Sequence, residues 1–139
     1  MTRDHYLALK GNLKTLAEEI RKTRQQLKID QREFSIFERE VGTYNALYNR
    51  DADTFRWGQA HKPVASAQVK LLELRAEYRA KHIIYCLARG RTLEQIEPKS
   101  REGYWRAHVY GQLIPRFAKI YEFEGELPDI RTKDERIYA

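Results

Sequence analysis

Residues 4–48 read DHYLALKGNLKTLAEEIRKTRQQLKIDQREFSIFEREVGTYNALY. Neither Gly nor Pro occurs between Gly11 and Gly42, which favours a long helix. The apolar residues recur at alternating steps of three and four, the spacing of a heptad seam. The members of this seam are Tyr6, Leu9, Leu13, Leu16, Ile20, Thr23, Leu27, Phe34, Phe37, Val41, Tyr44 and Tyr48. The pattern predicts that they bury one face of a helical segment.

Asp30 is the one strongly misplaced residue of this seam. It also resembles a helix N-cap, because Glu33 three positions later completes a capping box. Two interpretations follow, one helix of about 40 residues with a polar notch or two helices that meet near residues 28–30. We favour a first helix from Asp4 to about Leu27 and a second that continues its direction to about Tyr48.

The next segment predicts a loop and then a second long helix. Residues 49–62 (NRDADTFRWGQAHK) have no helical period, and we expect a loop anchored by Phe55 and Trp57. Pro63 suits the first position of a helix, and Gly90 suits its end. The apolar residues of that helix are Ala67, Leu71, Leu74, Tyr78 and Tyr85, with Leu72, Ile83, Ile84 and Leu87 beside them. We expect an all-α protein with a long, coiled-coil-like antiparallel helical hairpin over about 4–89.

The sequence pattern of the C-terminal third predicts shorter helices than those of the hairpin. Thr92 with Gln95 forms a capping box for a short helix, TLEQIE, which Pro98 stops. We expect another helix over 104–114, kinked or restarted at Pro115 and continuing to about Tyr121. Residues 122–139 predict an extended acidic tail. The expected domains are a helical arm (1–77), a basic tri-helical segment (78–121) and a polar tail (122–139).

Composition excludes several classes of protein. The chain of 139 residues has a single Cys, so a disulfide scaffold is excluded. No apolar run approaches the ~18 residues that span a bilayer, and the first residues lead into no signal-peptide core. We expect a protein with no membrane association that is cytoplasmic, with the nucleoid or nucleus as alternatives.

Positive charge is concentrated in one part of the chain. Lys and Arg number 26 against 20 Asp and Glu, a net charge of +6. Residues 63–121 hold 11 basic and 5 acidic side chains, whereas residues 122–139 hold 3 and 6. The densest basic run comprises Arg79, Lys81, Arg89, Arg91, Lys99, Arg101, Arg106 and Arg116, with Tyr104, Trp105 and Tyr110 interleaved. Arginines beside aromatic rings are typical of nucleic-acid surfaces; otherwise the arginines keep a helical face soluble while the rings fill the core.

The order of elements from Tyr85 to Leu113 resembles the tri-helical core of helix-turn-helix proteins. An apolar helix ends at Gly90, a second helix follows as TLEQIE, and Gly103–Gln112 takes the place of the recognition helix. The resemblance implies a core of Leu87, Leu93, Ile96, Val109 and Leu113. It also implies that Arg101, Tyr104, Arg106 and His108 face DNA. Pro98 and the long separation of Ile96 from Val109 depart from the pattern, and a plain helical bundle is the alternative.

Residue patterns for metal binding or catalysis are weak. His82 and Cys86 lie four apart on one helix face, but a metal site would need further ligands such as His61 or His108. An apolar setting favours a buried structural cysteine instead. Carboxylates are interspersed with basic residues, and phosphate-loop, hydrolase and zinc-protease motifs are absent from the sequence. We expect no catalytic residues, no metal and no cofactor.

The leading hypothesis is a non-enzymatic protein that binds nucleic acid. Its expected ligand is duplex DNA in preference to RNA. Binding combines counterion release with aromatic stacking or groove insertion. The predicted site consists of Arg89, Arg91, Lys99, Arg101, Tyr104, Trp105 and Arg106.

The alternative is a small helical adaptor or inhibitor, of a phage type, that docks on a larger protein or ribonucleoprotein. The seam over residues 6–27 can serve a homodimer, although its imperfections favour packing within one chain. The acidic tail is either a solubilising end or a segment that folds over the basic residues and competes with nucleic acid.

Overall fold

The computed structural model describes residues 1–48, 54–96 and 106–128. Within these ranges the regular structure is helical and no strand occurs, which confirms the all-α prediction. The expectations for residues 49–53, 97–105 and 129–139 lie outside the described residues. They include the turn before the third predicted helix and most of the acidic tail.

The first helix is continuous. α1 runs from Arg3 to Tyr48, 46 residues, so the preferred division into two helices near residue 30 is wrong. Asp30 does not act as a cap, because its side chain accepts a hydrogen bond from Gln26 Nε2 at 3.0 Å, one turn earlier on the same helix. This i,i+4 contact satisfies the carboxylate at the half-exposed edge of the seam, and the helix continues through it.

The second helix begins earlier than expected. α2 spans Thr54–Ala88, so the loop predicted at 49–62 is wrong over residues 54–62, and Pro63 lies inside the helix. The reason lies in aromatic packing: the Phe34 ring stands at steep angles to the Trp57 and His61 rings, with centroid distances of 5.4 and 4.9 Å. Trp57 and His61 also stack on one another at 5.0 Å. Side chains four residues apart are in contact on one face of a helix, and these contacts offset the hydrogen bond that Pro63 removes.

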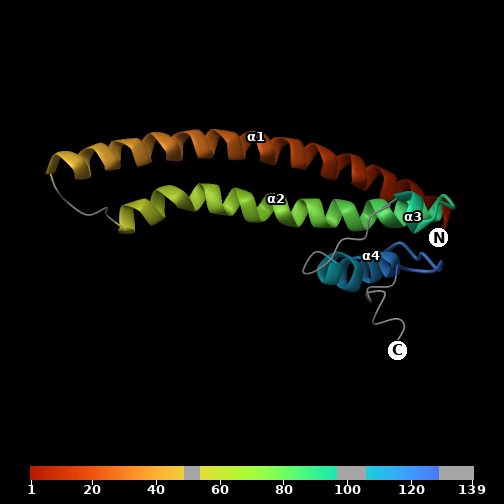
Figure 1. Ribbon diagram of the computed structural model, residues 1–139. Helices are drawn as coiled ribbons and strands as arrows, with labels where there is room; N and C mark the ends of the chain where they lie inside the picture. Colours follow the sequence, from red (N-terminus) through yellow and green to blue (C-terminus); the bar gives the residue numbers. More distant parts are fainter. Residues whose placement is uncertain (49–53, 97–105, 129–139) are drawn as a thin grey trace, which may run out of the picture. The chain divides into compact units, whose positions relative to one another are not determined.

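The two long helices pack together as the predicted antiparallel hairpin (Figure 1). Tyr6 stacks on Tyr85, Lys81 Nζ donates to Asn12 Oδ1, and Phe34 meets Trp57. Partner numbers fall along α2 as they rise along α1, which defines the antiparallel direction. Leu9, Leu13, Leu16 and Thr23 of the predicted seam are buried. The seam over residues 6–27 is therefore used inside its own chain.

The chain divides into two compact units, which differ from the predicted domains. The first comprises Met1–Ala17 with Leu74–Ala139, and the second comprises Glu18–Glu73. The first unit also holds three shorter elements: α3 (Leu93–Ile96), the π-helix η1 (Arg106–Leu113) and α4 (Ile114–Ile120). The helix expected over 104–114 is thus π-helical from Arg106, and Pro115 lies in the first turn of α4. Proline is tolerated there because that N–H has no partner within the helix.

The core of the first unit forms where the C-terminal half of α2 is covered on two sides. α1 contributes Leu9 to this core, and η1 and α4 contribute Val109, Tyr110, Ile114, Phe117 and Ala118. Between them lie Ala76, Ala80, Ile83 and Ile84 of α2, of which the last three are 0% exposed. Leu87, Ile96 and Leu113 pack partly buried against this cluster, as the predicted tri-helical core requires. The side chain of Leu93 lies outside the described residues.

Lys81 is a cation in the interior of this unit. It is only 6% exposed and is held by Asn12 and by Glu77 Oε1 at 3.0 Å. Its ammonium group also lies 4.7 Å from the centre of the Phe117 ring. A buried charge is tolerated only when it is paired and hydrogen-bonded. Lys81 therefore joins α1, α2 and α4 and is not part of a basic surface.

The second unit has a small core, and among its described residues Val69 and Leu72 are the most exposed large apolar side chains. Thr23 of α1 is buried, as are Val64, Ala67 and Leu71 of α2. Leu72, which we expected to thicken the seam, is 61% exposed, and Val69 is 55% exposed. Leu72 follows Leu71 by about 100° around the helix, which turns it away from α1.

We expect Ile83→Ala to lower the free energy of unfolding by about 2–5 kcal/mol, because it empties space between α1, η1 and α4. Leu72→Ala, an exposed change on the same helix, should stay within about 0.5 kcal/mol of the parent protein. Urea unfolding followed by circular dichroism measures both. Equal effects of the two changes would contradict the arrangement of this core.

Candidate nucleic-acid interface

The predicted site is only partly described. Arg89 and Arg91 lie at the end of α2, and both are exposed. Arg106 begins η1, but its side chain lies outside the described set. Lys99, Arg101, Tyr104 and Trp105 fall wholly outside the described residues. The described geometry of the candidate interface therefore consists of Arg89, Arg91 and the side chains around them.

Gly90 separates the two arginines and sets their directions. Its φ of +83° lies in the left-handed region that favours glycine. Gly90 N–H donates to Leu87 O at 2.9 Å, and Arg91 N–H donates to Cys86 O at 3.1 Å. These two bonds form a Schellman motif, as the glycine in the sequence predicts. Both guanidinium groups thus lie at the negative end of the helix dipole, which they stabilise.

A stacked pair of tyrosines lies beside Arg89. Its guanidinium carbon is 5.7 Å from the centre of the Tyr85 ring, and Tyr85 stacks on Tyr6 at 5.2 Å. Tyr6 Oη donates to Tyr85 Oη at 3.2 Å. This hydrogen bond is the main cause that lowers the pKa of Tyr85, with the charges of Arg89 and Lys10 adding to it, and that raises the pKa of Tyr6. The Tyr85 hydroxyl can still donate its own proton to an acceptor such as a phosphate oxygen.

Arg91 lies over a different group of side chains. Its Nη1 approaches Cys86 Sγ at 3.7 Å, and His82 Nε2 lies 3.5 Å from the same sulfur. His82 stacks on Tyr78 with ring centroids 5.8 Å apart. Burial lowers the pKa of His82, and the nearby Arg79 and Arg91 lower it further. A neutral imidazole at pH 7 is the result.

The described residues supply no ligand set for a metal. Cys86 is 2% exposed, and among the described His, Cys, Asp and Glu side chains no group of three could hold an ion. The His82–Cys86 pair places a buried thiol beside a neutral imidazole.

The other described members of the basic segment do not share one exposed surface. Lys81 is buried, and Tyr110, one of the interleaved rings, is only 3% exposed. Its ring fills the core and is not available for stacking on bases. His108 is half-buried, and its Nδ1 lies 3.1 Å from Gln112 Oε1 on the same π-helix. Arg116 is exposed on α4, with its guanidinium carbon 5.6 Å from the Phe117 ring centre.

The short helix after Arg91 begins as predicted. Gln95 N–H donates to Thr92 Oγ1 at 3.3 Å, and Thr92 N–H donates to Gln95 Oε1 at 3.0 Å. The capping box is therefore confirmed, and α3 ends at Ile96. The sequence over 97–105, which would decide whether a helix-turn-helix forms, lies outside the described residues.

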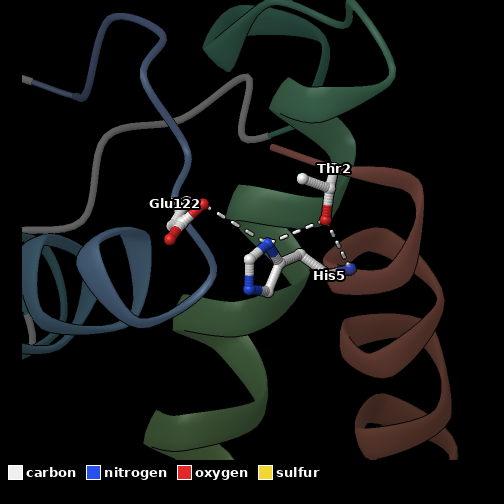
Figure 2. Close-up of polar contacts among 3 residues, drawn as sticks. All are labelled: Thr2, His5 and Glu122. Carbon is white, nitrogen blue, oxygen red and sulfur yellow. Dashed lines mark hydrogen bonds and ion pairs between the residues drawn. The ribbon is translucent and has the colours of Figure 1, made fainter.

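The N-terminus of α1 adds a contact that the sequence did not indicate (Figure 2). Thr2 Oγ1 accepts a hydrogen bond from His5 N–H at 3.2 Å and lies 2.9 Å from His5 Nδ1. The same Nδ1 lies 3.7 Å from Glu122 Oε2, in the turn after α4. Phe123 and Leu127 of this turn pack against the core. The start of the predicted acidic tail is thus held at the beginning of α1, next to Tyr6.

Comparison with known proteins finds no matching family model, no matching curated protein and no matching solved structure. Among the helices that the structure describes, none combines the length and the apolar character needed to cross a membrane.

Gly90→Ala should lower the free energy of unfolding by about 1–2 kcal/mol, because an L side chain is strained at this φ. Gly11→Ala is the matched control, since Gly11 lies inside α1 and its Cβ would meet nothing within 4 Å. That change should raise stability by about 0.5–1 kcal/mol. Chemical unfolding separates the two signs, and a neutral Gly90→Ala would rule out the left-handed cap.

Acidification should weaken the fold through His82. Because its pKa is lower in the folded protein, the unfolded chain takes up the proton more readily as pH falls below about 6.5. The contribution is fully present above that pH and is lost below it. The unfolding midpoint should therefore fall less between about pH 7.5 and 5.5 in His82→Gln than in the parent. His108→Gln should retain the parent's decline; a decline equal in all three proteins would show that His82 is not responsible.

Proposed function

We propose that this protein binds duplex DNA without chemistry on it, through the basic and aromatic end of the first unit. The observation that carries the proposal is the exposed pair Arg89 and Arg91 on either side of Gly90, with the Tyr6–Tyr85 stack beside them. Within the described residues neither arginine has a carboxylate at ion-pair distance. Both are therefore available to phosphate oxygens.

Charge and chemistry support phosphate as the partner. Guanidinium groups contact phosphate with two parallel N–H bonds, and tyrosine hydroxyls commonly donate to the backbone of DNA. Lys10 adds a further positive charge near Tyr85. The other members of the proposed site enter on the strength of their sequence: Lys99, Arg101, Tyr104, Trp105 and Arg106.

A salt-titrated mobility-shift assay with random duplex DNA, single-stranded DNA and RNA tests the proposal. If about five phosphates are neutralised, the logarithm of affinity should fall against that of salt with a slope near −4 to −5. Arg89→Gln with Arg91→Gln should make the slope shallower by about two. Lys70→Gln with Arg75→Gln changes the net charge equally and should leave the slope nearly unchanged. The absence of binding at about 50 mM salt would refute the function.

A second candidate function, docking on a larger protein, is favoured by the outward face of α2 in the second unit. Val69 and Leu72 are exposed there, and a shallow hollow of about 400 Å³ is lined by Ala65, Ser66, Val69, Lys70 and Glu73. Exposed apolar residues grouped on one face are typical of interaction sites. A single stoichiometric partner that survives nuclease treatment, and that Val69→Asp with Leu72→Asp releases, would establish this alternative.

A further inference from the structure

Most of the basic side chains of α1 share one side of the helix. We call these seven residues the cationic row: Arg3, Lys10, Lys14, Arg21, Lys28, Arg32 and Arg39. They follow one another at steps of seven or four residues, which are two turns or one turn of helix. The 36 steps from Arg3 to Arg39 make ten turns at 3.6 residues per turn, so the members return to the same side of α1 over a rise of about 54 Å along its axis.

The row contains no other kind of residue. At ~100° per residue its members fall within an arc of about 40°, and every position of α1 from 3 to 39 in that arc is Lys or Arg. All seven side chains are exposed. The acidic residues of the helix point elsewhere, as does the seam that packs on α2. The row is thus a face of a single sign on one unbroken helix.

The part of the chain that the structure describes leaves some of these charges without a partner, although Arg21 and Arg39 each have a contact. Arg21 is paired with Glu18, an exposed contact of a kind that contributes little. Lys28 and Arg32 have neither a hydrogen bond nor an ion pair in the part of the chain that the structure describes. Lys10 with Lys14, and Lys28 with Arg32, are like charges four residues apart, which destabilises an isolated helix. A solvated helix face normally mixes the two signs, and a bound polyanion would offset this repulsion.

The surroundings of the row favour the backbone of a duplex over other polyanions. A helix that lies on a membrane needs a broad apolar face, but the large apolar residues exposed on α1 are only Leu7, Ile29 and Ile36 among those described. No aromatic residue occurs within the arc, so the row offers no ring for stacking on the bases of a single strand. A rise of about 54 Å along the helix axis equals the length of about 16 base pairs of duplex.

We infer that the cationic row on α1 is a second, sequence-independent contact surface for the phosphate backbone of duplex DNA. The inference rests on the proposed function, because it takes DNA as the ligand, but apart from Lys10 it concerns residues that the Arg89–Arg91 end of the first unit does not include. Phosphate contacts of this kind position a protein on the duplex and carry no base specificity.

The test uses the full chain and a random duplex of 24 base pairs, which is longer than the row. Lys28→Gln with Arg32→Gln removes two charges at positions distant in sequence from Arg89. The slope of log affinity against log salt should become shallower by about two, with the loss equal on unrelated duplex sequences. Lys22→Gln with Lys62→Gln, both exposed and off the row, should leave the slope nearly unchanged. Circular dichroism checks that both variants keep the helix content of the parent.

The outcomes separate the two proposals. Suppose that the parent binds duplex DNA and that Arg89→Gln with Arg91→Gln weakens the binding. If Lys28→Gln with Arg32→Gln then gives the same salt slope as its control, the row is not a contact surface and the proposed function stands. If the parent binds no duplex, both proposals fall. Vesicles of phosphatidylserine and phosphatidylcholine give a third arm: binding to them that exceeds binding to DNA and depends on Lys28 and Arg32 would assign the row to a membrane instead.

Discussion

Burial of the C-terminal half of α2 on two sides is the constraint on which the first unit depends. Ile83 and Ile84 are wholly buried between Leu9 of α1 and the residues of η1 and α4. Because one stretch of helix supplies both contacts, the hairpin and the C-terminal helices share a single core. Lys81 extends this core into polar chemistry, since its ammonium group meets Asn12, Glu77 and the Phe117 ring. The end of α2, and with it Arg89 and Arg91, is held by this packing.

Burial also divides the basic residues into two kinds with different roles. Lys81 belongs to the core, whereas Arg89 and Arg91 stay exposed at a helix terminus and the cationic row of α1 faces outward. A count of charges along the chain does not separate these kinds, because it ignores direction around the helix. The row, over residues 3–39, lies wholly outside the segment 79–116 where charge density is highest, and its members are neighbours only on the helix surface.

Several local features could be predicted because short-range physics determines them. The alternating spacing of Leu9, Leu13 and Leu16 predicted the buried face, and Gly90 predicted the end of the second helix. The errors arose where distant residues decide. Residues 54–62 have no helical period, yet Trp57 and His61 pack on Phe34 and make the segment helical. Of the predicted site, Arg89 and Arg91 have the exposure that was expected, but their neighbour Tyr6 comes from the other end of the chain.

The sequence by itself determined the all-α class, the seam of the hairpin and the caps at Gly90 and Thr92, because helix period and capping act over a few residues. Tertiary structure alone decided that α1 continues through Asp30, that Leu72 faces solvent and that Lys81 is buried. The physical reason is the same in each case. Whether a polar or apolar side chain is buried depends on which second surface covers it, and that surface is supplied by residues far away along the chain.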